Sequence, residues 1–226
     1  MARSFNATTR ILAQVYKLAG AIPNAAVVAT AEDIALTSES LVIARQSGDN
    51  TAVAFSHMNR AMALLHSSEG DPRAGLEELA VAREIIVEEK LTMTLRRLTD
   101  LEFARAKLRS GDLEVAVALA RQVLDEQFAT GEKIYRGPAT TVLCDALFRR
   151  GTKHDVEEVQ EAIARLAAVA TEPGFVLHEL PLLRLRAILA RNRGDERRYK
   201  QFLTRFRKTA LAADFEGYSA QAEAMT

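Results

Sequence analysis

The chain has 226 residues, of which 48% are apolar and 27% charged, and its 30 basic and 30 acidic side chains cancel. This apolar fraction is too high for a disordered chain, and no apolar run approaches the roughly 18 residues that a membrane span needs. The neutral balance argues against binding nucleic acid over the whole surface. Because Cys144 stands alone and the N-terminus shows no secretion signal, we expect no disulfide and a cytoplasmic location.

The helical period dominates the chain from end to end. Leu76, Leu79, Ala82 and Ile86 form one apolar stripe at helical spacing, and no segment alternates apolar and polar residues as a strand would. We therefore expect helices and no sheet. The expected helices lie near 4–19, 25–47, 51–68, 72–89, 93–110, 113–130, 138–150, 155–171, 181–193 and 195–213, with a short helix after Gly217.

Glycines recur at a nearly constant interval. Gly70, Gly111 and Gly194 are each followed by Asp, and Gly151 lies between the last two, so the intervals are 41, 40 and 43 residues. A glycine can end one helix in the left-handed conformation, and the following Asp can cap the next helix. The pattern predicts a repeat of two helices joined by a tight turn.

Two further kinds of residue recur at fixed distances before the glycines. Small residues lie seven positions before the glycines and predict close contact between the two helices of a pair. They are Ala13, Ala63, Ala104, Cys144 and Ala187. Pro138 and Pro181 each stand 13 residues before a glycine, which predicts that a helix starts at each proline.

These observations predict an all-α fold. We expect five antiparallel helix pairs that stack into a right-handed superhelix, an α-solenoid, because a single pair cannot bury its own apolar face. No Ser-, Gly- or Pro-rich linker divides the chain, so residues 1–226 are expected to form a single domain. The short helix after Gly217 is expected to cap the stack.

The order Ala63, Gly70-Asp71, Ala82, repeated as Ala104, Gly111-Asp112, Ala116, resembles the tetratricopeptide repeat (TPR). The resemblance is partial, because the period of 40–43 residues exceeds the 34 of the standard motif and implies longer helices. Asn59 and Asp100 also fill slots that usually hold a large apolar residue. Gly75, Val156 and Tyr199 replace the alanine of the second helix.

The long period resembles the divergent TPR-like repeats that follow a nucleotide-cyclase or ATPase module in large bacterial regulators, including LuxR-type regulators. The stretch from Arg45 to Ile85 and the C-terminal stretch from Leu180 resemble those regions, and the latter ends with Phe215-Glu216-Gly217 and a short Ala/Glu/Met helix. The resemblance implies a sensor or scaffold portion of such a regulator. It implies no catalytic activity, because the cyclase and ATPase residues are absent from this sequence.

Motifs for chemistry are missing from the sequence. It contains no P-loop, dinucleotide-binding glycine motif, nucleophile elbow or His-Glu-x-x-His zinc motif. Cys144 occupies a packing slot, and His57, His66, His154 and His178 are never three or four residues apart, so no paired zinc ligands arise. His154 adjoins Asp155 in an expected loop, where Asp155 and Glu158 have the spacing of a capping box. We expect no enzyme, cofactor or metal.

One segment is strongly basic. Arg184 to Lys208 carries ten cations against Asp195 and Glu196, whereas Glu69 to Glu102 carries nine acids against five bases. The basic segment is either solvated helix surface, or a surface for an anion or a protein, or a head-to-tail contact with the acidic middle. Nucleic acid is the least favoured partner, because Tyr199, Phe202 and Phe206 follow a core spacing and no groove-entering motif accompanies the charge.

The first helix of each pair is expected to line a concave, partner-binding face. Apolar side chains with arginines would suit a peptide or helix that carries apolar anchors and carboxylates. The expected face comprises His57, Arg60, Leu64, Leu101, Arg105, Leu108, Asp145, Phe148, Arg184, Ile188 and Arg191. We therefore expect a protein- or peptide-binding scaffold, with a homodimer through the end faces as a further option. The alternative is a sensor that binds a small anionic effector through Arg60, Arg105 and Arg184.

Overall fold

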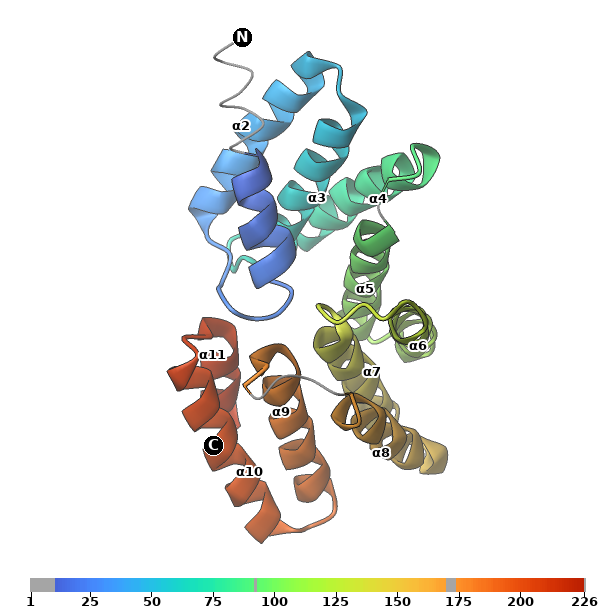
Figure 1. Cartoon of the computed structure of the whole chain (residues 1–226), viewed down its shortest axis with the longest axis vertical. Coiled ribbons are helices and arrows are strands. Elements are labelled where there is room, and N and C mark those ends of the chain that lie inside the picture. The colour runs from blue at the N-terminus through green and yellow to red at the C-terminus, as the bar shows by residue number, and fades with distance from the viewer. Residues whose placement is uncertain (1–10, 92, 170–173, 226) are drawn as a thin grey trace. The chain divides into compact units, whose positions relative to one another are not determined.

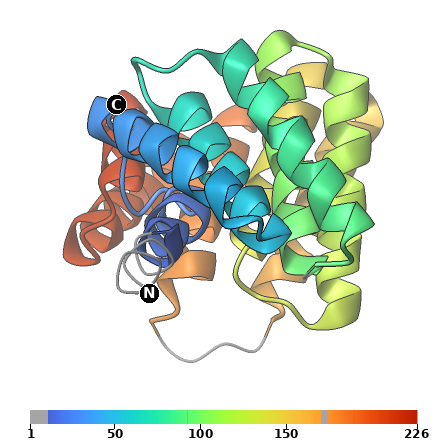
Figure 2. The ribbon, with the colours of Figure 1, turned by 90° about the horizontal axis from the view of Figure 1, so that it is seen from above.

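The computed structural model describes residues 11–91, 93–169 and 174–225, and helices dominate both of its views (Figures 1 and 2). Over these residues there is no strand, and an isolated parallel bridge between Ala29 and Ser67 is the one extended contact. The expected all-α class is therefore correct. None of the helices in the described ranges has the length and apolar character that a bilayer crossing requires.

The chain forms two compact units, residues 1–99 and 100–226, and the boundary falls within α5 (Met93–Ser110). The first unit contains the π-helix η1 (Val15–Ala21), α2 (Ala31–Ser47), α3 (Asn50–His66), α4 (Pro72–Glu88) and the start of α5. Helix α3 lies at its centre and packs against η1, α2 and α4. Its Ala54, Met58 and Met62 are fully buried and four residues apart, so they lie on one face of the helix.

The second unit contains the remainder of α5 and six further helices. They are α6 (Leu113–Thr130), α7 (Arg136–Arg150), α8 (Lys153–Ala167), α9 (Val176–Asn192), α10 (Glu196–Ala212) and α11 (Glu216–Ala224). From α6 to α11 each helix packs against the next along the chain, and α7 also packs against α9. The expectation of one domain over residues 1–226 stays a prediction.

The repeat glycines end helices as expected at three of four positions. Gly111, Gly151 and Gly194 have φ values of 84°, 70° and 72°, the left-handed conformation of a helix end. Gly70 does not adopt it. A Cβ there would lie 2.1 Å from the carbonyl oxygen of Leu64, so this turn needs glycine for a close backbone approach.

The turn between α2 and α3 follows the same rule but was absent from the predicted repeat. Gly48 ends α2 with a φ of 69°, and the Asp49 carboxylate accepts hydrogen bonds from the backbone N–H groups of Thr51 and Ala52. Asp71 and Asp195 also cap their helices, whereas the Asp112 side chain makes no such bond. Gly48-Asp49 lies only 22 residues before Gly70, and for this reason a search for forty-residue intervals passes over it.

Several predicted helix starts were wrong. Helix α7 begins at Arg136, two residues before Pro138, and Pro181 lies inside α9. The second predicted helix begins at Ala31 instead of residue 25, because Thr30 and Asp33 form a capping box. Residues 4–10 of the first predicted helix lie outside the described residues.

The start of α8 also differs from the prediction. His154 lies inside this helix, and the capping box joins Thr152 to Asp155 instead of Asp155 to Glu158. The Thr152 backbone N–H donates to Asp155 Oδ2 at 2.8 Å. The last predicted helix begins one residue before Gly217, at Glu216.

The small-residue register holds from the third helix onward. Ala63, Ala104, Cys144 and Ala187 all have zero exposed surface, as expected for positions where two helices approach closely. Ala13 is exposed, so the register does not extend to the first helix.

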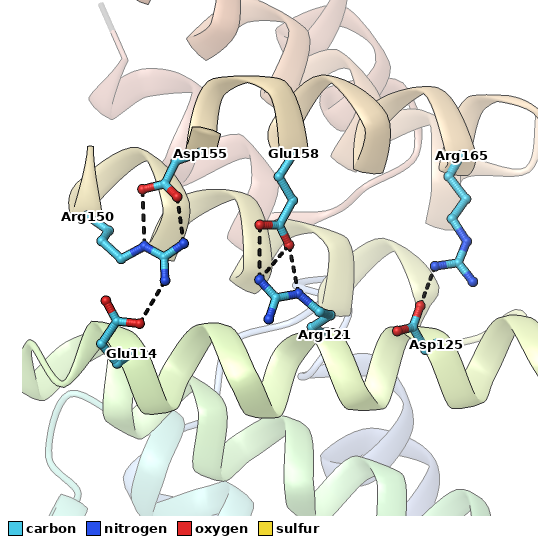
Figure 3. A network of polar contacts seen from close by, with 7 residues as sticks. All are labelled: Glu114, Arg121, Asp125, Arg150, Asp155, Glu158 and Arg165. Carbon is cyan, nitrogen blue, oxygen red and sulfur yellow. Dashed lines mark hydrogen bonds and ion pairs between the residues drawn. The ribbon is translucent and has the colours of Figure 1, made fainter. Parts of the chain in front are cut away.

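Polar contacts in the second unit connect residues about one repeat apart. Arg121 of α6 donates two hydrogen bonds to Glu158 of α8, at 2.8 and 3.0 Å, across a separation of 37 residues (Figure 3). Arg165 of α8 pairs with Asp125 of α6, 40 residues earlier. Because residue numbers rise together along both helices, α6 and α8 run in the same direction, as equivalent helices of successive repeats do.

Arg150, at the end of α7, joins the same network (Figure 3). It contacts Asp155 at 2.5 and 3.1 Å and Glu114 at 2.8 Å. Its hydrogen bonds to Asp155 raise the pKa of Arg150, and that guanidinium holds the pKa of Asp155 well below its usual value, against the effect of burial.

Candidate functional site

The side chains predicted to bind a partner divide between the two units. His57, Arg60 and Leu64 belong to the first unit, and the other eight belong to the second. Leu64 is 6% exposed and packs in the core, so its side chain is not available to a partner. Each unit is therefore considered by itself.

In the first unit, His57 and Arg60 converge on a carboxylate that sequence reasoning missed. Nδ1 of His57 lies 2.5 Å from Oε2 of Glu78 on α4, and Nε of Arg60 donates to Oε1 of Glu78 at 2.9 Å. Arg60 also donates to the Ser38 hydroxyl of α2. His57 and Arg60 thus join α3 to α2 and α4, and their polar atoms already have internal partners.

In the second unit, α5 contributes a buried leucine and an internally paired arginine. Leu101 has no exposed surface and belongs to the core. Nη1 of Arg105 donates to Oε1 of Glu102 at 2.6 Å, and the Glu102 side chain is completely buried. A buried carboxylate needs such a partner, because an unpaired charge in the interior is costly.

A forked ion pair on the predicted face joins α7 to α9. Arg184 donates two hydrogen bonds to Asp145, both at 3.0 Å, from a position 39 residues later in the chain. Burial disfavours the charge on Arg184, but the Asp145 carboxylate outweighs it and raises the pKa of the guanidinium. The forked geometry fixes both side chains at once.

Tyr218 of α11 is a site residue that the sequence did not reveal. It is 4% exposed and packs against Phe206, with ring centroids 5.8 Å apart, and against Phe215. Burial raises the pKa of Tyr218 to about 12, against the nearby positive charges of Arg184 and Arg105. A short C-terminal helix therefore brings a phenol into the electrostatic reach of both arginines.

Besides the paired side chains of Arg105, Asp145 and Arg184, four predicted residues of the second unit keep partial or full exposure. Leu108, Phe148 and Ile188 are half-buried, and Arg191 is exposed. The Leu108 carbonyl accepts a hydrogen bond from Arg149, and the Arg191 guanidinium lies 5.4 Å from the centre of the Tyr199 ring. These side chains, from α5, α7 and α9, are the part of the predicted face that a partner could contact.

The remaining reactive side chains fill structural positions. Cys144 is completely buried, and this burial raises the pKa of its thiol. His178 is 3% exposed with Nε2 at 3.0 Å from the Lys133 carbonyl, whereas His154 is exposed with Nδ1 at 3.7 Å from Glu157. Within residues 11–91, 93–169 and 174–225, no cluster of three His, Cys, Asp or Glu side chains could hold a metal ion.

In the second unit, satisfied ion pairs lie beside half-buried apolar side chains on α5, α7 and α9. Such a surface can bind through apolar area and through the outer edges of its arginines. Comparison of the chain with protein-family models, with curated proteins and with solved structures finds no match.

Proposed function

We propose that this chain is a non-enzymatic scaffold that binds a protein or peptide through its first helices. In this proposal the helix pairs form a TPR-like, right-handed superhelix, and the chain serves as the regulatory portion of a cytoplasmic bacterial signalling or transcription regulator. The partner-binding face is the exposed part of the predicted set in the second unit: Leu108, Phe148, Ile188 and Arg191.

One observation carries the proposal. Contacts between residues 37 to 41 apart join equivalent helices, as in Arg121–Glu158 of α6 and α8, Arg184–Asp145 of α9 and α7, and Arg149–Leu108 of α7 and α5. A stack built in this way repeats the same exposed positions on each first helix. Repeated positions suit an extended partner, which can contact several helices with modest affinity for each.

The alternative function, sensing of a small anion, has less support from the geometry. Each of the three arginines that would bind the anion already pairs with a carboxylate: Arg60 with Glu78, Arg105 with Glu102, and Arg184 with Asp145. An anionic effector would have to displace those carboxylates and leave them buried or half-buried without a partner, which is unfavourable.

The test is selection of peptides on the purified chain, followed by binding measurements with two matched pairs of variants. Ile188→Thr and Arg191→Glu should each weaken binding of a selected peptide by about tenfold, since each removes a contact at the exposed face. Val87→Thr on α4 and Arg193→Glu at the end of α9 should leave it unchanged, because both are exposed elsewhere.

Circular dichroism should report equal helicity for all four variants. Enrichment of no peptide by the wild-type chain, or equal losses from the test and control variants, would contradict the proposed binding face.

A further inference from the structure

A groove separates α6 from α8 in the second unit, on second helices and away from the predicted face. Its volume is about 460 Å³, and Leu124, Leu143 and Ala162 supply its apolar lining. All three are nearly or completely buried, so they form the floor. The ion pairs Arg121–Glu158 and Arg165–Asp125 cross from one helix to the other (Figure 3).

The rim of the groove has a surplus of negative charge. Two arginines and four carboxylates line it, and Glu158 and Asp125 are already paired with those arginines. Glu157 and Glu161 remain, exposed and one helical turn apart on α8. The carboxylate of Glu157 lies 3.7 Å from His154 Nδ1, whereas Glu161 makes no ion pair with any residue that the structure describes.

The outer face of α10 carries the complementary pattern. Lys200, Thr204, Lys208 and Leu211 follow each other at helical spacing, and all four are exposed. Leu211 is 70% exposed, so it presents a large apolar side chain to solvent at the end of the helix. Lys208, one turn before it, makes no ion pair within the described ranges.

We propose that the α6–α8 groove binds helix α10 of a second copy of this chain. Leu211 would cover the apolar floor, and the lysines of α10 would meet the exposed carboxylates of Glu157 and Glu161. Both partners are second helices of the same unit, so the contact leaves the partner-binding face on the first helices open. The inference therefore goes beyond the proposed scaffold function and does not depend on it.

Each copy carries both the groove and the α10 surface, so the contact can form either a closed dimer or an open chain of copies. Two copies that exchange their α10 helices would form a two-fold dimer, and copies that do not close would associate head to tail. In either case the charged rim makes association sensitive to salt, since exposed charges are screened within roughly 10 Å at 0.1 M.

The experiment is sedimentation velocity of the whole chain over a range of concentrations, at low and at high sodium chloride. We expect reversible self-association that weakens by about tenfold or more at high salt. Glu157→Lys with Glu161→Lys should weaken it similarly, and Leu211→Ser should weaken it at both salt concentrations, because the serine removes the apolar anchor.

A charge swap gives the decisive comparison. Lys200→Glu with Lys208→Glu, added to the two glutamate reversals, should restore association. Glu84→Lys, an exposed reversal on α4, should leave it unchanged. A chain that stays monomeric at every concentration, a swap that fails to restore association, or an equal effect of Glu84→Lys would each overturn the proposal.

Discussion

At the scale of single residues, charged side chains find partners that sequence spacing rarely reveals. Arg105 and Glu102 are three residues apart and could be paired by inspection of one helix. Glu78 lies 18 residues from Arg60, and Asp145 lies 39 residues from Arg184, so these pairs depend on how helices pack. The prediction therefore placed Arg60, Arg105, Arg184 and Asp145 on the face, but it identified neither the Arg184–Asp145 pair nor Glu78 and Glu102 as partners.

Arg184 gives a direct test of this view. Arg184→Ala should lower the free energy of unfolding by about 1–3 kcal/mol, because it leaves the half-buried Asp145 carboxylate without its forked partner. Arg193→Ala, at an exposed position two turns later, should change it by less than about 0.5 kcal/mol. Urea unfolding followed by circular dichroism measures both, and equal effects would refute the structural role of the pair.

The lowered pKa of Asp155 predicts that the stability of the fold depends on pH. Its folded pKa lies below the ordinary value of 3.8, so the charged form stabilises the fold above that pH. Asp155→Asn should cost about 2–3 kcal/mol at pH 7, since Arg150 loses its buried partner. As pH falls below about 3.8, the wild-type advantage should shrink by roughly 1.4 kcal/mol per pH unit.

The measurement is urea unfolding of the wild type and Asp155→Asn between pH 7 and pH 3. Glu84→Gln, at an exposed position, serves as the control and should differ little from the wild type throughout. A gap between wild type and Asp155→Asn that is constant with pH would contradict the assignment.

At the scale of elements, helix existence was predictable and helix ends were less so. The helices at 72–88, 93–110 and 113–130 match their predicted ranges within a residue, because Pro72 and the glycine turns mark their ends. The start predicted at Pro181 was wrong because this proline lies in the second turn of α9, where its missing N–H removes one helical hydrogen bond, to the Leu177 carbonyl, and the helix continues. The left-handed turn predicted at Gly70 was wrong, because a glycine can also be needed where two backbone segments approach closely.

Substitution by alanine should cost more at a glycine where two helices approach closely than at a glycine in an open, left-handed turn. At Gly137, in the first turn of α7, a Cβ would lie 2.2 Å from the Leu177 carbonyl of α9, so Gly137→Ala must move one helix. We expect a loss of about 2–4 kcal/mol from overpacking. Gly131→Ala, with a φ of 75° and open space around it, should cost only about 1 kcal/mol. Chemical unfolding ranks the two, and the reverse order would contradict the α7–α9 approach.

At the scale of the whole molecule, the predicted single domain can be compared with the two compact units. Scanning calorimetry should give one transition whose calorimetric and van't Hoff enthalpies agree, because α5 is continuous across residues 99 and 100 and couples the units. Two resolved transitions would mean that the units unfold separately. The all-α class followed from periodicity, whereas the spatial relation of equivalent helices required long-range contacts.

The central claim is that residues one repeat apart face each other on successive parallel helices. The most direct measurement is crosslinking with a short bismaleimide in a Cys144→Ala background. Cysteine pairs at 121 and 158, and at 125 and 165, should crosslink readily, because Arg121–Glu158 and Arg165–Asp125 are in contact. A pair at 121 and 165 is displaced by two turns along α8 and should crosslink poorly. Equal yields from all three pairs would contradict the stacked repeat.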